Sequence, residues 1–160
     1  MSERSLGRRS VLALASIVVV VDQVSKSWMT AALAEGNTIK AVPGLLDFKL
    51  VHNTGAAFSL LTGSTLLLGV LSLAVAVGVM IWMWKQRRLA LWQGLAVAFL
   101  LGGTIGNGLD RWRLGYVVDF LALVPIDFPI FNGADIAINL AVLCFALDLL
   151  MSSRGQVRRG

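Results

Sequence analysis

Four long apolar stretches dominate the pattern of hydrophobic and polar positions along the chain. They cover residues 11–33, 66–84, 89–109 and 131–151. A helix that crosses the hydrocarbon core of a bilayer needs about 20 mostly apolar residues, and each stretch is long enough. The pattern therefore predicts an all-α polytopic membrane protein with four transmembrane helices, built as a single domain over residues 1–160.

Two longer connections separate these stretches. The first, residues 34–65, contains the alternating segment LDFKL at residues 46–50, which predicts a half-buried strand. Pro43 and Gly44 come just before it and indicate a turn. The second connection, residues 110–130, is amphipathic, and its aromatic side chains predict a segment that lies in the membrane interface.

Composition agrees with a membrane location. Hydrophobic residues make up 57% of the 160 residues and charged residues only 14%. A soluble domain carries about 25% charged residues, so an ordinary soluble enzyme is excluded. A chain this apolar is not intrinsically disordered either.

The net charge of +5 is explained by where the basic residues stand. Nine of the fourteen lie before the first stretch, between the second and third, or after the fourth: Arg4, Arg8, Arg9, Lys85, Arg87, Arg88, Arg154, Arg158 and Arg159. Four spans place all these positions on one side, and the positive-inside rule makes that side cytoplasmic. The charge surplus is thus a topology signal with both termini inside, and it gives no support for nucleic-acid binding.

The start of the chain also resembles a secretory signal. A basic opening precedes an apolar run, and Ala32-Leu33-Ala34 fits a cleavage site. Asp22 and Lys26 would stand between that run and that site, which is unusual for a segment that is removed. We therefore expect the segment to remain as the first span.

Ionised side chains in a membrane helix are costly, about 2.5–3.5 kcal/mol at its centre, so the few present are functional candidates. Asp22 and Lys26 stand four apart on the first predicted helix, a spacing that suits an ion pair. A purely structural pair is the competing interpretation. Asn53 lies in an unusual run of small residues in the first outer connection, for which an ordinary turn is the alternative.

Further polar residues follow the third stretch and begin the fourth. Asn107, Asp110 and Arg111 share one helical face if the third helix continues past residue 109. Asn132 and Asp135 likewise share a face at the start of the fourth helix, where an acid also gains from the helix dipole.

Asp119 is an acid within an apolar stretch, and topology places it with Asp135 in the outer half of the protein. Two carboxylates in one apolar site tend to share a proton, because both cannot ionise comfortably. Such a pair is suited to amide hydrolysis, with one member as base and the other as acid. The single His52 and single Cys144 cannot form a His/Cys metal cluster, and the sequence calls for no metal and no cofactor.

Five blocks, in order along the chain, resemble the motifs of lipoprotein signal peptidase, the signal peptidase II family. They are DQVSK at residues 22–26, NTGAAFS at 53–59, GGTIGNGLDR at 102–111, VVDF at 117–120 and FNGAD at 131–135. The resemblance implies an aspartyl endopeptidase of the bacterial cytoplasmic (inner) membrane. It would remove the signal peptide of a prolipoprotein just before a diacylglyceryl-modified cysteine.

The resemblance also implies roles for individual residues. Asp119 and Asp135 match the catalytic pair. The positions that support this pair or the bound substrate are Asp22, Lys26, Asn53, Asn107, Asp110, Arg111 and Asn132. It further implies a small extracytoplasmic β-sheet cradle, a short interfacial helix, contact with membrane lipid and inhibition by globomycin.

Two other classes of protein stay open at this point. A small ion-coupled transporter would also bury acids, although its site usually lies near the bilayer midplane, with access from both sides. A non-catalytic assembly subunit would use polar groups to join helices.

Overall fold

The computed structural model of the chain describes residues 5–33, 37–55 and 63–157, with side chains up to residue 152. Its helices are α1 (Arg8–Ala32), α2 (Thr65–Lys85), α3 (Leu91–Leu114) and α4 (Gly133–Val157). Its strands are β1 (Ser5–Gly7), β2 (Thr38–Val42), β3 (Leu46–Asn53), β4 (Arg88–Ala90) and β5 (Val117–Leu123). The all-α description drawn from the sequence covers the helices but not the two small sheets, of which the family resemblance implied one.

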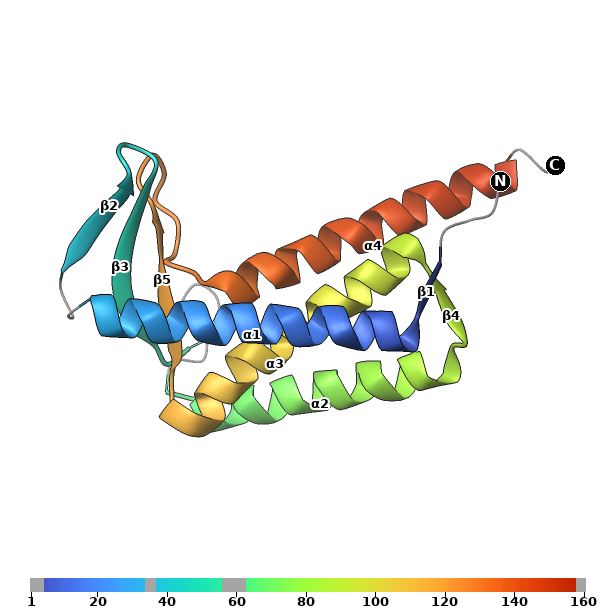
Figure 1. Ribbon diagram of the computed structural model, residues 1–160, viewed down its shortest axis with the longest axis horizontal. Helices are drawn as coiled ribbons and strands as arrows, with labels where there is room; N and C mark the ends of the chain where they lie inside the picture. Colours follow the sequence, from blue (N-terminus) through green and yellow to red (C-terminus); the bar gives the residue numbers. More distant parts are fainter. Residues whose placement is uncertain (1–4, 34–36, 56–62, 158–160) are drawn as a thin grey trace.

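The helices form a bundle in which α3 packs against α1, α2 and α4. The two sheets lie at opposite ends of this bundle (Figure 1). The three-stranded sheet stands where α1 ends and α4 begins, and the two-stranded sheet lies where α1 begins and α2 ends. This arrangement gives the bundle two chemically different ends.

Both sheets are antiparallel. The larger has the strand order β2-β3-β5, and an isolated bridge between Leu121 and Phe131 ties β5 to the segment before α4. The predicted turn is present, with Gly44 at a φ of +75° that glycine adopts without strain. The predicted strand at residues 46–50 is confirmed as the first part of β3.

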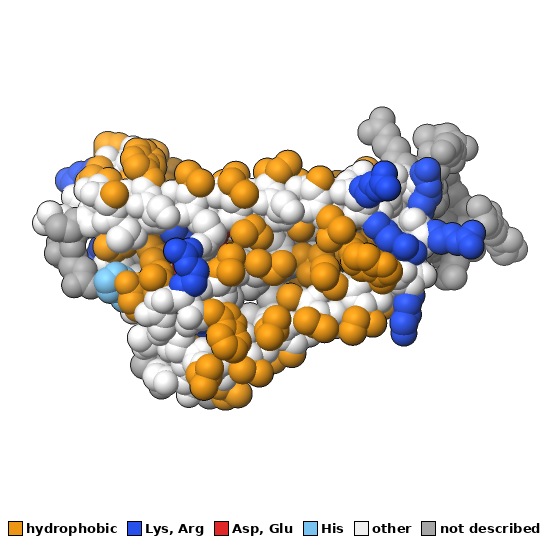
Figure 2. Space-filling view, turned by 60° about the horizontal axis from the view of Figure 1, so that its bottom comes forward, with side chains coloured by type: hydrophobic (Ala, Val, Ile, Leu, Met, Phe, Trp, Pro, Cys, Tyr) orange, Lys and Arg blue, Asp and Glu red, His pale blue; other side chains and the backbone are white. Residues whose placement is uncertain are grey.

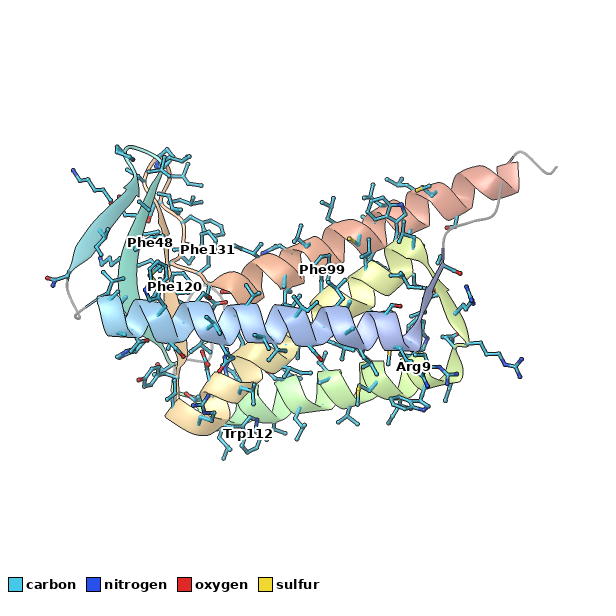
Figure 3. All side chains as sticks on the ribbon, in the orientation of Figure 1. Arg9, Phe48, Phe99, Trp112, Phe120 and Phe131 are labelled. Carbon is cyan, nitrogen blue, oxygen red and sulfur yellow. The ribbon has the colours of Figure 1, made fainter. Side chains whose placement is uncertain are left out.

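The larger sheet packs on the end of α1 through a small apolar core. Met29 of α1 and Leu33, which follows α1, form one buried cluster with Val118 and Phe120 of β5. Phe48 meets Phe120 edge to face, with ring centroids 6.4 Å apart (Figure 3). This core fixes β5 relative to the bundle, and with it the position of Asp119.

The bundle is apolar outside and partly polar inside. Large apolar side chains such as Val24, Trp28 and Leu71 are more than half exposed, whereas Asp22 and Lys26 are buried. Exposed apolar surface on this scale marks contact with a membrane or a partner. In a bilayer these outer faces contact lipid chains, and the polar groups find their partners inside the protein.

Three helices of the described part are long and apolar enough to cross a membrane: Arg8–Ala32, Thr65–Lys85 and Gly133–Ser152. They correspond to the first, second and fourth predicted spans. The helix of the third span is present but differs from the prediction. It starts at Leu91, after a strand, and continues five residues past the expected end at residue 109.

The second outer connection was predicted incorrectly. In place of an amphipathic segment at the interface, α3 extends to Leu114 and β5 follows after Gly115, whose φ of +81° ends the helix. Phe120 is buried in the core instead of facing the membrane surface. Within the ranges that the structure describes, no short separate helix is found, and residues 56–59 of the second motif lie outside those ranges.

Candidate active site

The first turn of α4 carries a capping box formed by Asn132 and Asp135. The backbone N–H of Asp135 donates to Oδ1 of Asn132 at 3.0 Å, and the backbone N–H of Asn132 donates to Oδ2 of Asp135 at 3.1 Å. This reciprocal pair satisfies two donors at the start of the helix. It also holds the Asp135 carboxylate in one orientation.

Asp22 of α1 supplies a further cap to the same turn. Its Oδ1 accepts the backbone N–H of Ala134 at 2.8 Å, where the helix dipole favours a negative charge. The close approach requires glycine at position 106, because a Cβ there would lie 2.5 Å from Oδ2 of Asp22. The sequence motif at residues 102–111 therefore brings α1, α3 and α4 together at one point.

Lys26 bridges two carboxylates inside the bundle. Its Nζ lies 2.9 Å from Oδ2 of Asp22 and 3.0 Å from Oδ2 of Asp110. It also donates to Oδ1 of Asn107 at 2.9 Å. The predicted pair of Asp22 and Lys26 is confirmed, but it is part of a larger network in which one cation serves two acids on two helices.

Asp119 on β5 is held by two amides. Nδ2 of Asn53 donates to its Oδ2 at 2.8 Å, and Nδ2 of Asn132 donates to its Oδ1 at 2.6 Å. The position of Asp119 is fixed by the register of β5 on β3, in which Asp119 stands opposite Val51. Strand pairing thus brings Asn53 beside the acid, although the two are 66 positions apart.

Asn132 links the two acids, since its side-chain amide binds Asp119 while its backbone N–H binds Asp135. Asn107 completes the connection. It accepts from Nδ2 of Asn132 at 3.1 Å and donates to Oδ1 of Asp135 at 2.8 Å. Asn132 therefore contacts both carboxylates, and Asn107 on α3 contacts Asp135 and Asn132.

The pKa of Asp119 is raised from 3.8 to about 6. Burial is the largest cause, and the nearby carboxylate of Asp135 raises the pKa further. Hydrogen bonds from Asn53 and Asn132 and the charge of Lys26 act in the opposite direction. A carboxyl group with this pKa exchanges its proton near neutral pH, as a general acid or base requires.

Arg111 lies at the rim of the network. Its Nη2 donates to the carbonyl oxygen of Gly55 at 3.2 Å, while its buried Nε has no hydrogen-bond partner among the described residues. Its sequence neighbour Asp110 pairs with Lys26 and accepts the backbone N–H of Val118 at 3.1 Å. Arg111 therefore holds its guanidinium group at the rim of the network that contains the acids.

All nine residues singled out in the sequence take part in this hydrogen-bond network or at its rim. Asn139, which shares the face of Asp135 by spacing, is exposed and donates only to the carbonyl oxygen of Asp135 within its own helix. Sequence reasoning missed Gln23, whose Nε2 donates to Asp110 at 2.8 Å and to the carbonyl oxygen of Gly106 at 3.2 Å. It also missed the capping box, which an asparagine followed three residues later by an acid could have indicated.

The described residues hold no group of three or more His, Cys, Asp or Glu side chains arranged to bind a metal ion. Cys144 is buried in α4, as expected for a core residue. His52 stacks on Tyr116 with ring centroids 4.1 Å apart. The chemistry available within these ranges is that of two carboxyl groups with amide and basic neighbours.

A helical bundle with an apolar exterior encloses a polar network that contains the buried Asp119 and the half-buried Asp135, and this architecture is that of a membrane enzyme. Two solved structures with the same fold are titled bacterial membrane enzymes determined by the in meso method. One matches with a TM-score of 0.86 at 26% identity, covering 96% of this chain and 94% of that chain. The other has a TM-score of 0.82 at 27% identity, covering 94% and 98%.

The protein-family model described as signal peptidase (SPase) II matches residues 14–151 of this chain. The lipoprotein signal peptidase of Parasynechococcus marenigrum (strain WH8102) is 61% identical over 155 residues, 97% of each chain. That of Enterococcus faecalis (strain ATCC 700802 / V583) is 36% identical over 141 residues, 88% of each. The chain therefore belongs to the signal peptidase II family, whose members are aspartic proteases that act on the signal peptides of lipoproteins.

Proposed function

We propose that this chain cleaves diacylglyceryl-modified prolipoproteins within the membrane, just before the lipidated cysteine, and that Asp119 and Asp135 are its catalytic pair. Membership of the family and the names of its relatives support the substrate class. One observation carries the assignment of the acids: both carboxylates are hydrogen bonded to Asn132, and Asn132 and Asp119 are buried.

In this mechanism the two acids share one proton. The ionised member takes a proton from a water molecule as the water attacks the scissile carbonyl, and the protonated member donates to the carbonyl oxygen, which gives a tetrahedral intermediate. The C–N bond then breaks as the amide nitrogen accepts a proton from one acid and a hydroxyl group of the intermediate returns a proton to the other, so the pair again holds one proton. The titration belongs to the pair rather than to either residue. Asp119, whose pKa is about 6, is able to change protonation state during the reaction.

The other residues support this pair. Asn53, Asn107 and Asn132 hold the carboxylates in place through their amides. The ionic network of Asp22, Lys26 and Asp110 holds α1, α3 and α4 at the distances that these amides require. Arg111, a cation at the rim of this network, is suited to bind a carbonyl group of the substrate backbone.

We further propose that all four helices cross the bacterial cytoplasmic (inner) membrane as one domain, with both termini inside and the acids near the extracytoplasmic face. Helix α3 has 24 residues, about 36 Å in length, which exceeds the hydrocarbon thickness of about 30 Å. It needs less apolar surface than the other helices because it packs against all three of them. Membrane lipid surrounds this bundle, and globomycin competes with the substrate.

The test is cleavage by the purified protein of a diacylglyceryl-modified precursor, with the cut located by mass spectrometry. Asp119→Asn and Asp135→Asn are each expected to abolish cleavage. Asp127→Asn is the matched control, because Asp127 is an exposed acid on the connection between β5 and α4. Chelators are expected to have no effect. Full activity of either catalytic variant would exclude this assignment.

A further inference from the structure

The end of the bundle opposite the acids carries a concentrated positive charge. Five basic side chains form this basic cluster: Arg8, Arg9, Lys85, Arg87 and Arg88. Figure 2 shows blue side chains gathered at that end of the molecule. Residues 5–9 and 85–90, which make up its backbone, contain no acidic residue.

Tertiary contacts assemble the basic cluster from two distant segments. Strands β1 and β4 pair with Gly7 opposite Arg88, which aligns the start of α1 with the link between α2 and α3. Nε of Arg8 donates to the carbonyl oxygen of Gln86 at 2.6 Å, and Nη1 of Arg88 donates to Oγ of Ser5 at 3.2 Å. These bonds hold like charges together, which is unfavourable unless an anion is present.

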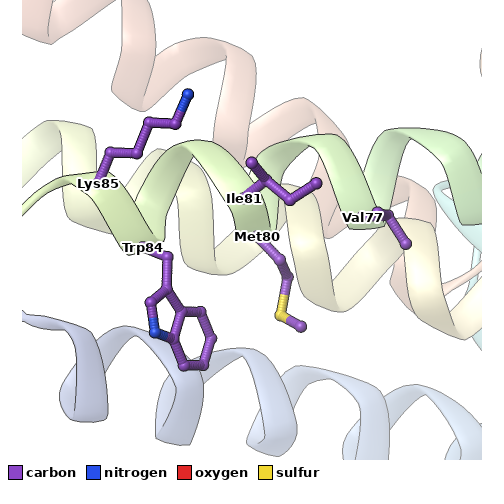
Figure 4. A pocket seen from close by; sticks show the side chains of 5 residues that line it. All are labelled: Val77, Met80, Ile81, Trp84 and Lys85. Atoms are coloured by element: carbon purple, nitrogen blue, oxygen red, sulfur yellow. The ribbon is translucent and has the colours of Figure 1, made fainter.

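An apolar groove leads along α2 to the basic cluster. It has a volume of about 470 Å³ and is lined by Val77, Met80, Ile81, Trp84 and Lys85 (Figure 4). The groove runs about 12 Å along the helix. It is apolar along its length and ends at the indole of Trp84 and the ammonium group of Lys85. This change from apolar to aromatic and then to charged side chains matches the transition from hydrocarbon to headgroup in a bilayer.

We propose that this groove and the basic cluster bind one anionic phospholipid. The acyl chain lies against Val77 and Ile81, and the phosphodiester is bound by Lys85 and its basic neighbours. A zwitterionic lipid would fill the groove equally well but would bring its own cation to the basic cluster. Charge complementarity therefore selects the anionic lipid. The inference rests on the proposed membrane orientation and not on peptide cleavage.

The experiment is native mass spectrometry of the full-length protein released from mixed micelles with equal amounts of phosphatidylglycerol and phosphatidylcholine of identical acyl chains. The wild-type protein is expected to retain phosphatidylglycerol preferentially. The combined variant Lys85→Gln, Arg87→Gln, Arg88→Gln is expected to lose this preference, with retention reduced roughly tenfold. The control is Lys40→Gln with Lys49→Gln, which removes two exposed lysines from the three-stranded sheet and is expected to behave as wild type.

A second variant tests the groove without changing any charge. Ile81→Trp fills the groove, and since Ile81 is 56% exposed the substitution leaves the core intact. It is expected to reduce retention of both lipids, whereas Val70→Trp elsewhere on exposed α2 surface is expected to change neither. Equal retention of both lipids by the wild type, or unchanged retention in both test variants, would overturn the proposal. A protein dimer in which Ile81 is covered by a second copy would also overturn it.

Discussion

Oδ1 of Asp22 accepts the backbone N–H of Ala134 at 2.8 Å, so an acid on α1 caps the first turn of α4. The two residues are 112 positions apart in the chain. The same carboxylate pairs with Lys26 through its other oxygen. The orientation of the turn that carries Asp135 thus depends on a charge located on another helix.

Removing that charge is expected to weaken both folding and cleavage. Asp22→Ala leaves the N–H of Ala134 unsatisfied and removes one of the two acids paired with Lys26. Breaking a buried ion pair from one side costs about 3–5 kcal/mol. Thermal unfolding is measured by reaction of Cys144, the single and buried cysteine, with a thiol-reactive dye. Asp22→Asn, which keeps an oxygen acceptor, is expected to lie between Ala and wild type.

Gly106 is expected to tolerate no side chain. In Gly106→Ala the new Cβ would lie 2.5 Å from Oδ2 of Asp22, and overpacking of this kind costs roughly 1–3 kcal/mol. The control is Gly78→Ala on α2, where a Cβ meets nothing within 4 Å and alanine is the better helix former. Melting temperatures should fall for the first variant and stay equal or rise for the second. Equal melting temperatures for the two would contradict the packing argument.

The two roles of Asn132 are separable by substitution. Asn132→Ser keeps an oxygen that caps α4 but removes the amide donor to Asp119, so we expect most of the stability to remain while kcat falls roughly 100-fold or more. Asn132→Ala removes both interactions and should lose stability as well. Steady-state kinetics with the lipidated precursor and melting temperatures check both effects. A serine variant with wild-type kcat would remove Asn132 from the proposed support of the acids.

The raised pKa of Asp119 predicts a defined dependence of stability on pH. The folded protein holds this proton more tightly than the unfolded chain does, since the pKa rises from 3.8 to about 6 on folding. The contribution to stability is therefore complete below about pH 3.8 and is lost as the pH rises through 6. Asp119→Asn cannot ionise, so the difference in melting temperature between the variant and wild type should change across this interval.

Two parallel curves from pH 4 to 8 would contradict this prediction. Asp127→Asn is again the control, because it removes an exposed acid that lies outside the site. Cleavage by the wild-type protein should change over the same interval, since the proposed mechanism requires one proton on the acid pair. The pH profile of kcat with the lipidated precursor measures this effect.

Much of the bundle was predictable because membrane insertion depends on local composition. The predicted spans at residues 11–33 and 66–84 differ from α1 and α2 by no more than three residues at any end. The third helix was harder to delimit, since its last turn carries Asp110 and Arg111, which lower the apolar signal while the helix continues. Residues 117–123 are apolar except for Asp119, and such a short segment does not distinguish a buried strand from an interfacial one.

The sequence was sufficient to identify which residues are chemically unusual, because a polar group in an apolar stretch is visible without any knowledge of its neighbours. It placed Asp119 and Asp135 in the same half of the protein through topology alone. Their partners depend on contacts between residues far apart in the chain. Only the packing of α1, α3 and α4 shows that Lys26 serves both Asp22 and Asp110.

The same limit applies to the acid pair. Spacing indicates that Asn132 and Asp135 are neighbours on a helix, but the link to Asp119 arises from the pairing of β5 with β3 and its bridge to Phe131. Hydropathy is a sum over adjacent residues, so the chain alone indicates which segments are apolar enough to span a membrane. The direction of each hydrogen bond and the approach of the two carboxylates depend on backbone segments that meet across the bundle. Only the tertiary structure determines how these segments meet.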